Sequence, residues 1–294
     1  MKRAVLIALL AFFSVTAWSQ DEGTFIWRFP ELRDLETGEV IPPKDYAVTS
    51  GAYGALQDTL WGSHQSISIV LFSLEEYQLS VVSAEGDAAN KTSVLCQKAG
   101  AVAGINGSYF NMKTLTPVTY LKDDGHVTGT TTQGETFRTN GAVLMEEGCV
   151  TIDAVEASTT WTGGDEWWEV MASGPILYDN EKAVTYTEGI QGWKGFYNAR
   201  HPRSLIGFEP DGRACLVVVD GRAPGKADGM TIAELTELCR LMGFSDALNL
   251  DGGGSSTLWT LSAGVISHPS DNGQFDHEGE RRVPNILTVT KAGN

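Results

Sequence analysis

Cysteine is scarce in this sequence. The chain has four cysteines, Cys96, Cys149, Cys215 and Cys239, and no two of them have CxxC spacing. Structural zinc sites are built from clustered Cys and His, so a site of that kind is not expected. Cys215 and Cys239 fall in apolar strand and helix patterns, which favours burial as small hydrophobic residues. The pattern leaves disulfide pairing open.

Positive charge is also scarce. Lysine and arginine total 21 against 37 aspartates and glutamates, for a net charge of −16. So acidic a chain offers no basic face to displace counterions, which excludes nucleic acid and anionic membranes as partners. An anionic substrate would need a few arginines gathered locally against this field. The positions of the arginines are therefore informative.

Long apolar runs are absent except at the start of the chain. An apolar stretch at 4–15 follows Lys2 and Arg3, and the small residues Ala17 and Ser19 come soon after it. This is the pattern of a signal peptide over residues 1–19. No other stretch approaches the roughly 20 apolar residues that cross a bilayer. We therefore expect an exported protein (periplasmic, cell-surface or secreted) without stable membrane insertion.

The remaining chain fits one domain, with residues 20–65 as an N-terminal extension that packs on a core of residues 66–294. The clearest pattern begins at 214–219, an almost continuous apolar run that predicts a central strand covered on both faces. Thr231 and Glu234 then form a capping box at the start of an amphipathic helix.

Gly243 is expected to end that helix, and a second strand follows at 247–250. The strand–helix–strand order predicts a right-handed crossover between parallel neighbours. We therefore expect an α/β (α+β mixed) single domain, with a mixed, partly parallel central sheet flanked by helices and long loops.

A glycine-rich turn directly follows the second strand. It reads Asp251, Gly252, Gly253, Gly254, Ser255, Ser256. Each glycine costs on the order of 1 kcal/mol relative to alanine, so the run indicates positive φ or close approach of the backbone to another group. Successive N–H groups in such a turn, with the serine hydroxyls, can bind an anion, and the alternative is a tight turn without a ligand. No GK[ST] or helix follows, so neither a Walker loop nor a dinucleotide site is expected.

Asp220 and Asp251 each follow an expected strand, at the strand end where α/β folds place their sites. Two carboxyl groups can serve as acid and base in hydrolysis, and one of them can bind a divalent cation, which the chemistry does not require. For each alone, a structural role is the alternative. Asn249 should point to the same side of its strand as Asp251.

Several arginines and tryptophans are candidates for substrate contact. Arginine binds phosphate bidentately, and Arg203, Arg222 and Arg282 are the candidates for an arginine pocket, whereas Arg281 fits a solvated surface position. The loop at 157–169 carries three tryptophans, which suit either stacking on sugar rings or packing as a lid against the core: Trp161, Trp167 and Trp168.

Taken in order, six motifs resemble the phosphodiester glycosidase family. They are Gly104-Ile105-Asn106-Gly107-Ser108-Tyr109-Phe110, Arg203-Ser204-Leu205-Ile206-Gly207, Asp220-Gly221-Arg222, Gly229-Met230-Thr231 with Glu234, Asn249-Leu250-Asp251-Gly252-Gly253-Gly254-Ser255-Ser256-Thr257 and Arg282-Val283-Pro284-Asn285. The resemblance spans residues 66–290, and the Asn-Leu-Asp-Gly-Gly-Gly-Ser-Ser block is its most specific part.

The resemblance implies hydrolysis of a sugar-1-phosphodiester, such as one of α-linked N-acetylglucosamine, to free sugar and a phosphomonoester, with no required cofactor. It implies a phosphorylated saccharide or glycan as partner, and catalytic roles for Asp220 and Asp251. The substrate-binding residues would be Asn106, Gly107, Tyr109, Arg203, Arg222, Asn249, Gly252, Gly253, Gly254, Ser255, Ser256 and Arg282, supported by Thr231, Glu234 and Asn285. Two alternatives remain: a non-catalytic carbohydrate- or cell-wall-binding module, and a phosphodiesterase that cuts the P–O bond.

Overall fold

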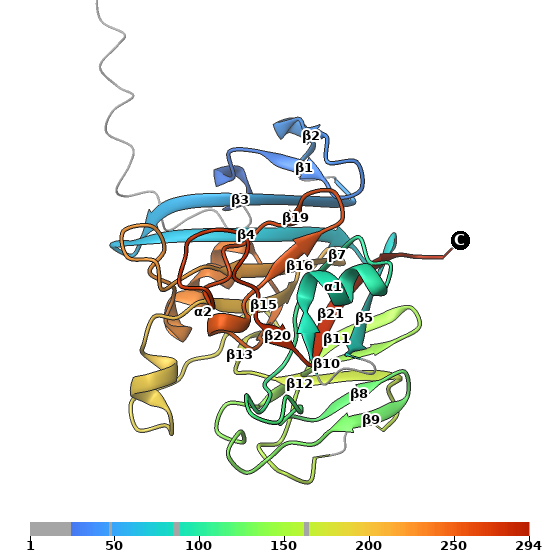
Figure 1. Cartoon of the computed structure of the whole chain (residues 1–294), viewed down its shortest axis with the longest axis vertical. Coiled ribbons are helices and arrows are strands. Elements are labelled where there is room, and N and C mark those ends of the chain that lie inside the picture. The colour runs from blue at the N-terminus through green and yellow to red at the C-terminus, as the bar shows by residue number, and fades with distance from the viewer. Residues whose placement is uncertain (1–24, 47–48, 85–88, 162–164, 294) are drawn as a thin grey trace, which may run out of the picture.

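The computed structural model describes residues 25–46, 49–84, 89–161 and 165–293, so the expected signal peptide at 1–19 lies outside the described residues. The largest element is a nine-stranded sheet (Figure 1). Its strands, in spatial order, are β14 (Lys182–Ala183), β13 (Ile176–Asp179), β17 (Asp246–Asn249), β15 (Arg203–Phe208), β16 (Arg213–Val219), β4 (Ser63–Ser73), β3 (Gly51–Leu60), β1 (Leu32–Asp34) and β2 (Val40–Ile41).

Two five-stranded sheets and a two-stranded ribbon complete the strands. One five-stranded sheet has the order β11 (Cys149–Ala154), β10 (Gly141–Glu146), β12 (Glu169–Ser173), β8 (Leu121–Asp123) and β9 (His126–Gly129). The other has the order β19 (Gly264–Val265), β18 (Leu258–Thr260), β7 (Ala103–Asn106), β21 (Asn285–Lys291) and β5 (Tyr77–Ser83). The ribbon pairs β20 (Arg282–Val283) with β6 (Asn90–Lys91). The helices are α1 (Thr92–Lys98) and α2 (Ile232–Met242), with short turns η1 (Phe25–Arg28), η2 (Pro43–Asp45), η3 (Trp193–Tyr197) and η4 (Gly253–Ser255). None of these helices is long and apolar enough to cross a membrane.

The expected α/β fold with a partly parallel sheet is wrong, because the protein is mainly β and every pairing between the described strands is antiparallel. Helix α2 does connect β16 to β17, and those two strands run in the same direction. However, β15 lies between them and pairs antiparallel with both. The carboxyl ends of β16 and β17 therefore still reach one edge of the sheet, on either side of the start of β15 at Arg203.

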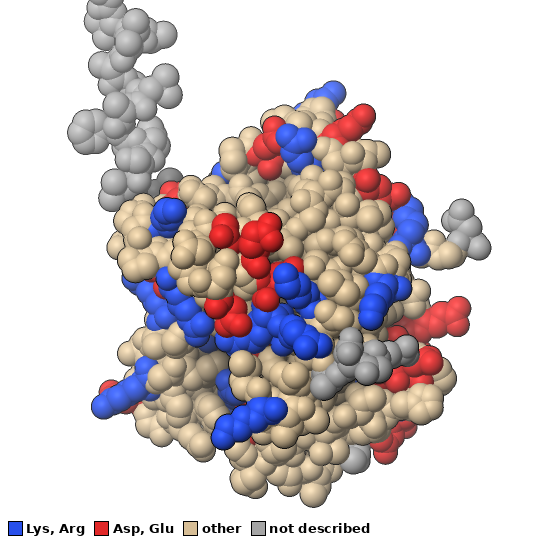
Figure 2. All heavy atoms as spheres, viewed as in Figure 1, with Lys and Arg blue, Asp and Glu red and all other residues tan. Residues whose placement is uncertain are grey.

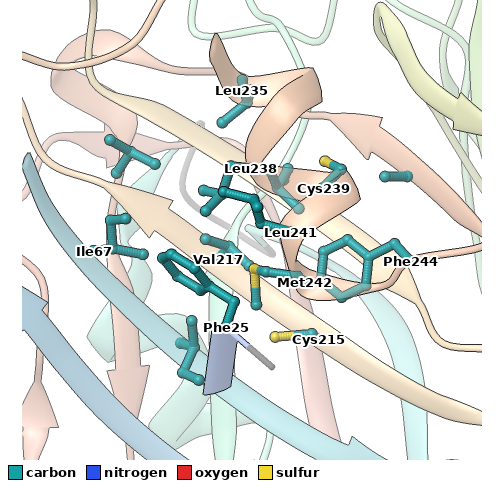
Figure 3. Packing of buried hydrophobic residues seen from close by; sticks show 14 of the residues in the cluster. Phe25, Ile67, Cys215, Val217, Leu235, Leu238, Cys239, Leu241, Met242 and Phe244 are labelled. Carbon is teal, nitrogen blue, oxygen red and sulfur yellow. The ribbon is translucent and has the colours of Figure 1, made fainter. Parts of the chain in front are cut away.

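The central position of β16 is confirmed, since it lies between β15 and β4 with core on both faces. Cys215 and Val217 face one cluster, where α2 packs on the sheet (Figure 3), and Leu216 and Val218 face the other. The alternating burial of an antiparallel strand is here replaced by burial on both sides, because α2 covers one face and the β5–β21–β7 sheet the other.

Local predictions for α2 are also confirmed. Thr231 and Glu234 form the capping box, and Gly243 ends the helix in the left-handed conformation at φ +75°. Cys215 and Cys239 are buried beside this helix, as expected (Figure 3). All four cysteines of the chain are free thiols.

The segment expected as an N-terminal extension supplies β1, β2 and β3 to one edge of the nine-stranded sheet. β3 pairs with β4 along its whole length, from Gly51 opposite Phe72 to Leu60 opposite Ser63. Its inward side chains join the core cluster under α2. This segment is thus continuous with the sheet that carries the site.

Carboxylates cover the free edge of β5. Glu169 of β12 accepts the Val81 N–H at 2.5 Å, and Asp123 of β8 accepts the Ser83 N–H at 2.8 Å. Both acceptors belong to the neighbouring five-stranded sheet, so they join the two sheets where no strand pairs. Burial, reinforced by the charges of Asp123 and Asp124, raises the pKa of Glu169 from 4.5 to about 7 despite the Val81 hydrogen bond.

This raised pKa predicts that stability falls as pH rises between about 4.5 and about 7, because the folded state binds the Glu169 proton more tightly than the unfolded state does. Glu169→Gln keeps an acceptor for Val81 and removes the titration. We expect the melting temperature of this variant to vary less over that pH range than that of the wild type. Glu147→Gln, at an exposed turn, is the control. If the melting temperatures of wild type and Glu169→Gln changed by the same amount over this pH range, the assignment would be contradicted.

Candidate active site

The glycine turn after β17 requires glycine at Gly252 and Gly253, whereas at Gly254 a Cβ would meet only the movable ends of the Arg281 and Asp271 side chains. A Cβ on Gly252 would lie 2.6 Å from the Pro202 carbonyl oxygen, Gly253 has φ +64°, and a Cβ on Gly254 would lie 2.3 Å from Nη2 of Arg281. The turn's N–H groups are largely used within the protein: Gly252 donates to Oδ1 of Asp251 and Gly253 to the Pro202 carbonyl, both at 2.9 Å. Contact with an anion therefore falls mainly to neighbouring side chains.

Asp251 is a half-buried residue, and its surroundings disfavour negative charge on the carboxyl group. Its backbone is fixed by hydrogen bonds, because its N–H donates to the Gly107 carbonyl and its carbonyl accepts from Nδ2 of Asn106 at 2.6 Å. Burial raises the pKa of the carboxyl group, although Ser255, Arg138, the Gly252 N–H and Arg281 favour the ionised form. A carboxyl group that holds its proton more strongly than usual is suited to proton transfer.

Three guanidinium groups surround this turn. Arg222 lies against Gly253, with Nη2 2.9 Å from where a Cβ would stand, and Arg281 lies against Gly254. Arg138 acts electrostatically on Asp251, and its guanidinium lies 3.7 Å from the centre of the Tyr109 ring. Figure 2 shows Lys and Arg gathered in a band across this face, over the region where Figure 1 places β15 and β20. Local positive charge thus exists in an acidic protein.

Arg222 is the most available of the three. It is exposed, and its guanidinium makes no hydrogen bond or ion pair with any residue the structure describes. Its backbone has φ +60°, a left-handed conformation that costs a non-glycine residue on the order of 1 kcal/mol. Such strain at an accessible arginine is typical of functional positions. Arg281, by contrast, is paired with Asp271 at 2.5 Å.

The other two arginines of the expected pocket use their donors on main-chain carbonyls. Arg203 is only 2% exposed and donates to the carbonyls of Met230 and Phe196 at 2.9 and 2.7 Å. Arg282, on β20, donates to the Ala89 carbonyl. The structure therefore brings Arg222 to the turn, together with Arg138 and Arg281, while Arg203 supports the backbone beneath it.

Asp220 is 1% exposed and holds a histidine that the sequence patterns did not indicate. Its carboxylate accepts from the Ser66 hydroxyl at 2.7 Å, and from both the backbone N–H and Nδ1 of His268 at 2.8 Å. A carboxylate at Nδ1 places the proton there and leaves Nε2 as a free base. Asp220 itself is shielded from solvent, and its contact with the rest of the site runs through the His268 ring.

Two loops hold the His268 ring in place. Phe275 stacks on it at 3.8 Å with planes 5° apart, and His277 lies 4.5 Å away. Lys226, from the loop after Arg222, lies 5.2 Å from the centre of the Phe275 ring. The segment that carries His268 also carries Arg281, which links the Asp220 end of the site to the glycine turn.

The remaining predicted site residues form a buried polar frame under the turn: Asn106, Gly107, Tyr109, Asn249 and Asn285, together with Ser255 and Ser256. Asn249 donates to the Tyr109 hydroxyl at 3.0 Å, and Oδ1 of Asn285 accepts the Ser108 N–H at 2.8 Å. These bonds hold β7, β17 and β21 in register at the strand ends. The structure gives this frame a supporting position rather than an exposed one.

Comparison with known proteins adds an independent observation. The family model described as phosphodiester glycosidase matches residues 99–290, which is more than half of the chain. The chain belongs to the phosphodiester glycosidase family.

Relatives of this family member differ in how much they share with it. Mouse N-acetylglucosamine-1-phosphodiester alpha-N-acetylglucosaminidase is 27% identical over 186 residues, which cover 60% of this chain and 35% of the mouse protein. The SPbeta prophage-derived uncharacterized protein YomE of Bacillus subtilis is 41% identical over 93 residues, 32% of this chain and 13% of YomE. The match thus spans about a third or less of these relatives' lengths.

Solved structures agree with the family at the level of the fold. The catalytic domain of the zebrafish N-acetylglucosamine-1-phosphodiester alpha-N-acetylglucosaminidase has a TM-score of 0.63 and 16% identity, covering 82% of this chain and 83% of that one. A hypothetical protein from Synechocystis has a TM-score of 0.64 and 14% identity, covering 82% of this chain and 62% of that one.

Within the part of this family member that the structure describes, no group of three or more His, Cys, Asp or Glu side chains is arranged to hold a metal ion. The acidic groups of the site instead have arginine, histidine and backbone N–H neighbours.

Proposed function

We propose that this protein hydrolyses the glycosidic bond of a sugar-1-phosphodiester, releasing free sugar and a phosphomonoester. The observation that carries the proposal is the setting of Asp251, a half-buried residue whose carboxyl pKa is raised by burial beside the charges of Arg138 and Arg281. The activity named for the mouse relative, on an N-acetylglucosamine-1-phosphodiester, supports the same class of substrate.

Arg222 and Arg281 would bind the phosphodiester. The substrate carries one negative charge, and each shielded, charge-assisted hydrogen bond to it is worth about 1.5–3 kcal/mol. Arg222 has all its donors free of described partners, whereas Arg281 would share its donors with Asp271. Their positions against Gly253 and Gly254 would set the phosphate directly over the turn.

Asp251 and His268 would divide the proton transfers. Water forms a new bond to the anomeric carbon as the bond from that carbon to the phosphate oxygen breaks. Nε2 of His268 takes a proton from the water, and Asp251 gives its proton to the departing oxygen. Asp220 holds the imidazole and stabilises its protonated form. No cofactor enters this scheme, so activity is expected to survive a chelator.

Export belongs to the same proposal and rests on residues 1–19 of the sequence alone. Measuring the location of the protein in its native cell, with and without those residues, tests it.

A panel of α-linked sugar-1-phosphodiesters tests the function. We expect free sugar and phosphomonoester in equal amounts from at least one member, in the presence and absence of chelator. The matched sugar-1-phosphates and phosphate-free glycosides are controls for the need for a diester. Binding of the diesters without any product would contradict the proposal and favour a carbohydrate-binding module.

A further inference from the structure

A cavity of about 260 Å³ lies between η3, β14 and the start of α2, apart from the turn at Asp251. Its lining is mainly apolar, with three aromatic rings and several aliphatic side chains, and its polar groups come from Asn198, Thr236 and Glu237; the rings are those of Tyr186, Trp193 and Tyr197. η3 packs beside α2, in the yellow segment to the left of β13 in Figure 1. No arginine or lysine lines the cavity, in contrast to the turn at Asp251.

The aromatic wall is held from behind. The Tyr186 hydroxyl donates to the Ile176 carbonyl at 2.9 Å and accepts from Asn140 at 2.8 Å, and the Tyr197 hydroxyl donates to the Phe137 carbonyl at 2.9 Å. The two rings lie 4.9 Å apart. With their hydroxyl groups fixed inside the protein, these rings offer carbon faces to the cavity at little entropic cost.

Trp193 completes the wall and is only partly buried. It begins a single turn of π-helix, a feature often found at functional positions. Its indole N–H makes no hydrogen bond to a described residue, and the exposed Asn198 adds an amide at the rim. A carbon-faced platform beside amide and carboxylate groups is complementary to a pyranose ring, which has an apolar C–H face and a polar edge.

The same helical turn also borders the arginine cluster. Phe196, between the cavity residues Trp193 and Tyr197, lies 5.3 Å from the Arg138 guanidinium and 6.4 Å from the centre of the Tyr109 ring. η3 thus has one side toward the Asp251 region and another toward the aromatic cavity. A glycan bound at Asp251 would cross η3 to reach the cavity.

We propose that this cavity binds a neutral pyranose ring of the glycan whose phosphodiester is cleaved, an inference that rests on the proposed function. Trp193 and Asn198 offer donors at the rim, whereas Glu237 is already paired with Arg240 at 2.8 Å. No free guanidinium or ammonium group of the described residues faces the cavity, so a neutral or amide-bearing sugar is favoured over an anionic one.

The three tryptophans of the 157–169 loop do not line this cavity. Trp161 packs edge-on against Tyr120 at 5.2 Å, and Trp167 packs against the same cluster, so both favour the core-packing alternative. Trp168 is 55% exposed, and its indole N–H donates to Asp124 at 3.1 Å. Trp168 therefore offers a matched control, an accessible tryptophan outside the cavity.

Direct binding of phosphate-free methyl glycosides tests the proposal. Saturation-transfer NMR on the full chain, with neutral hexosides and N-acetylhexosaminides, is expected to show binding to wild type and to Asp251→Asn. Trp193→Ala should weaken binding about tenfold or more and Asn198→Ala should weaken it less, while Trp168→Ala should leave it unchanged. Circular dichroism and melting curves establish that each variant is folded.

Kinetics separate this inference from the proposed function. With a diester that carries an extended glycan, Trp193→Ala should raise KM and leave kcat near wild type, and with a simple alkyl diester it should change neither. Glycoside binding that depends on Trp193, in a protein with no turnover, would retain the cavity assignment and remove the hydrolase. Equal glycoside binding by folded Trp193→Ala and wild type would overturn the cavity assignment, whatever the turnover.

Discussion

Asp251→Asn should lower kcat on a sugar-1-phosphodiester by about 10²–10⁴-fold while the protein stays folded. Asparagine keeps an oxygen that can accept the Gly252 N–H, which Oδ1 of Asp251 accepts at 2.9 Å, so the turn is preserved. It cannot deliver a proton to the leaving oxygen. Because burial disfavours the charged carboxylate, replacing it with a neutral amide should not lower the melting temperature.

The pH profile gives this prediction a second readout. In the proposed mechanism Asp251 acts as an acid in its protonated form, and its pKa is raised, so kcat/KM should fall as pH increases through that raised pKa. Asp251→Asn should lose this alkaline limb along with the rate. Asp211→Asn, an exposed carboxylate at the opposite end of β16, is the matched control and should behave as wild type. A nearly normal rate for Asp251→Asn would remove Asp251 from the chemistry.

Asp220→Asn and His268→Gln should each lower kcat by about 10²–10⁴-fold, and the double variant should be little worse than either single one. The reason is that Asp220 acts through His268: an amide that donates to Nδ1 would favour the other tautomer and leave Nε2 protonated. The exposed His126, outside the site, provides His126→Gln as control.

Two results would contradict the assignment of Asp220 and His268 as a pair that acts together. A purely structural role for Asp220 would lower the melting temperature of Asp220→Asn and leave kcat of the folded protein near that of wild type. Strictly multiplicative losses in the double variant would mean that Asp220 and His268 do not act as a unit.

Local sequence patterns predicted several elements of the fold, but they did not predict the order in which the strands pair. The apolar run of β16 correctly predicted burial, and Thr231 with Glu234 correctly predicted the start of α2. The predicted parallel pairing of β16 with β17 was wrong because another strand inserts between them. That strand is β15, which precedes β16 as its hairpin partner, and nothing in the local pattern of β15 fixes its place.

At the site, sequence reasoning located the glycine turn and both aspartates, but not their partners. His268 lies 48 residues from Asp220, in a stretch without periodicity, so no local spacing connects the two. Arg281 and Arg282 are adjacent, and neighbouring residues in extended chain point to opposite sides. Only the pairing of β20 with β6 determines that Arg281 faces the turn while Arg282 reaches Ala89.

Isotope incorporation from H₂¹⁸O tests the central claim most directly. Hydrolysis of a sugar-1-phosphodiester in labelled water, followed by mass spectrometry of both products at early times, reports which bond breaks. Attack at the anomeric carbon predicts one ¹⁸O in the free sugar and none in the phosphomonoester. Label in the phosphate and none in the sugar would show P–O cleavage and contradict the glycosidase mechanism built on Asp251 and His268.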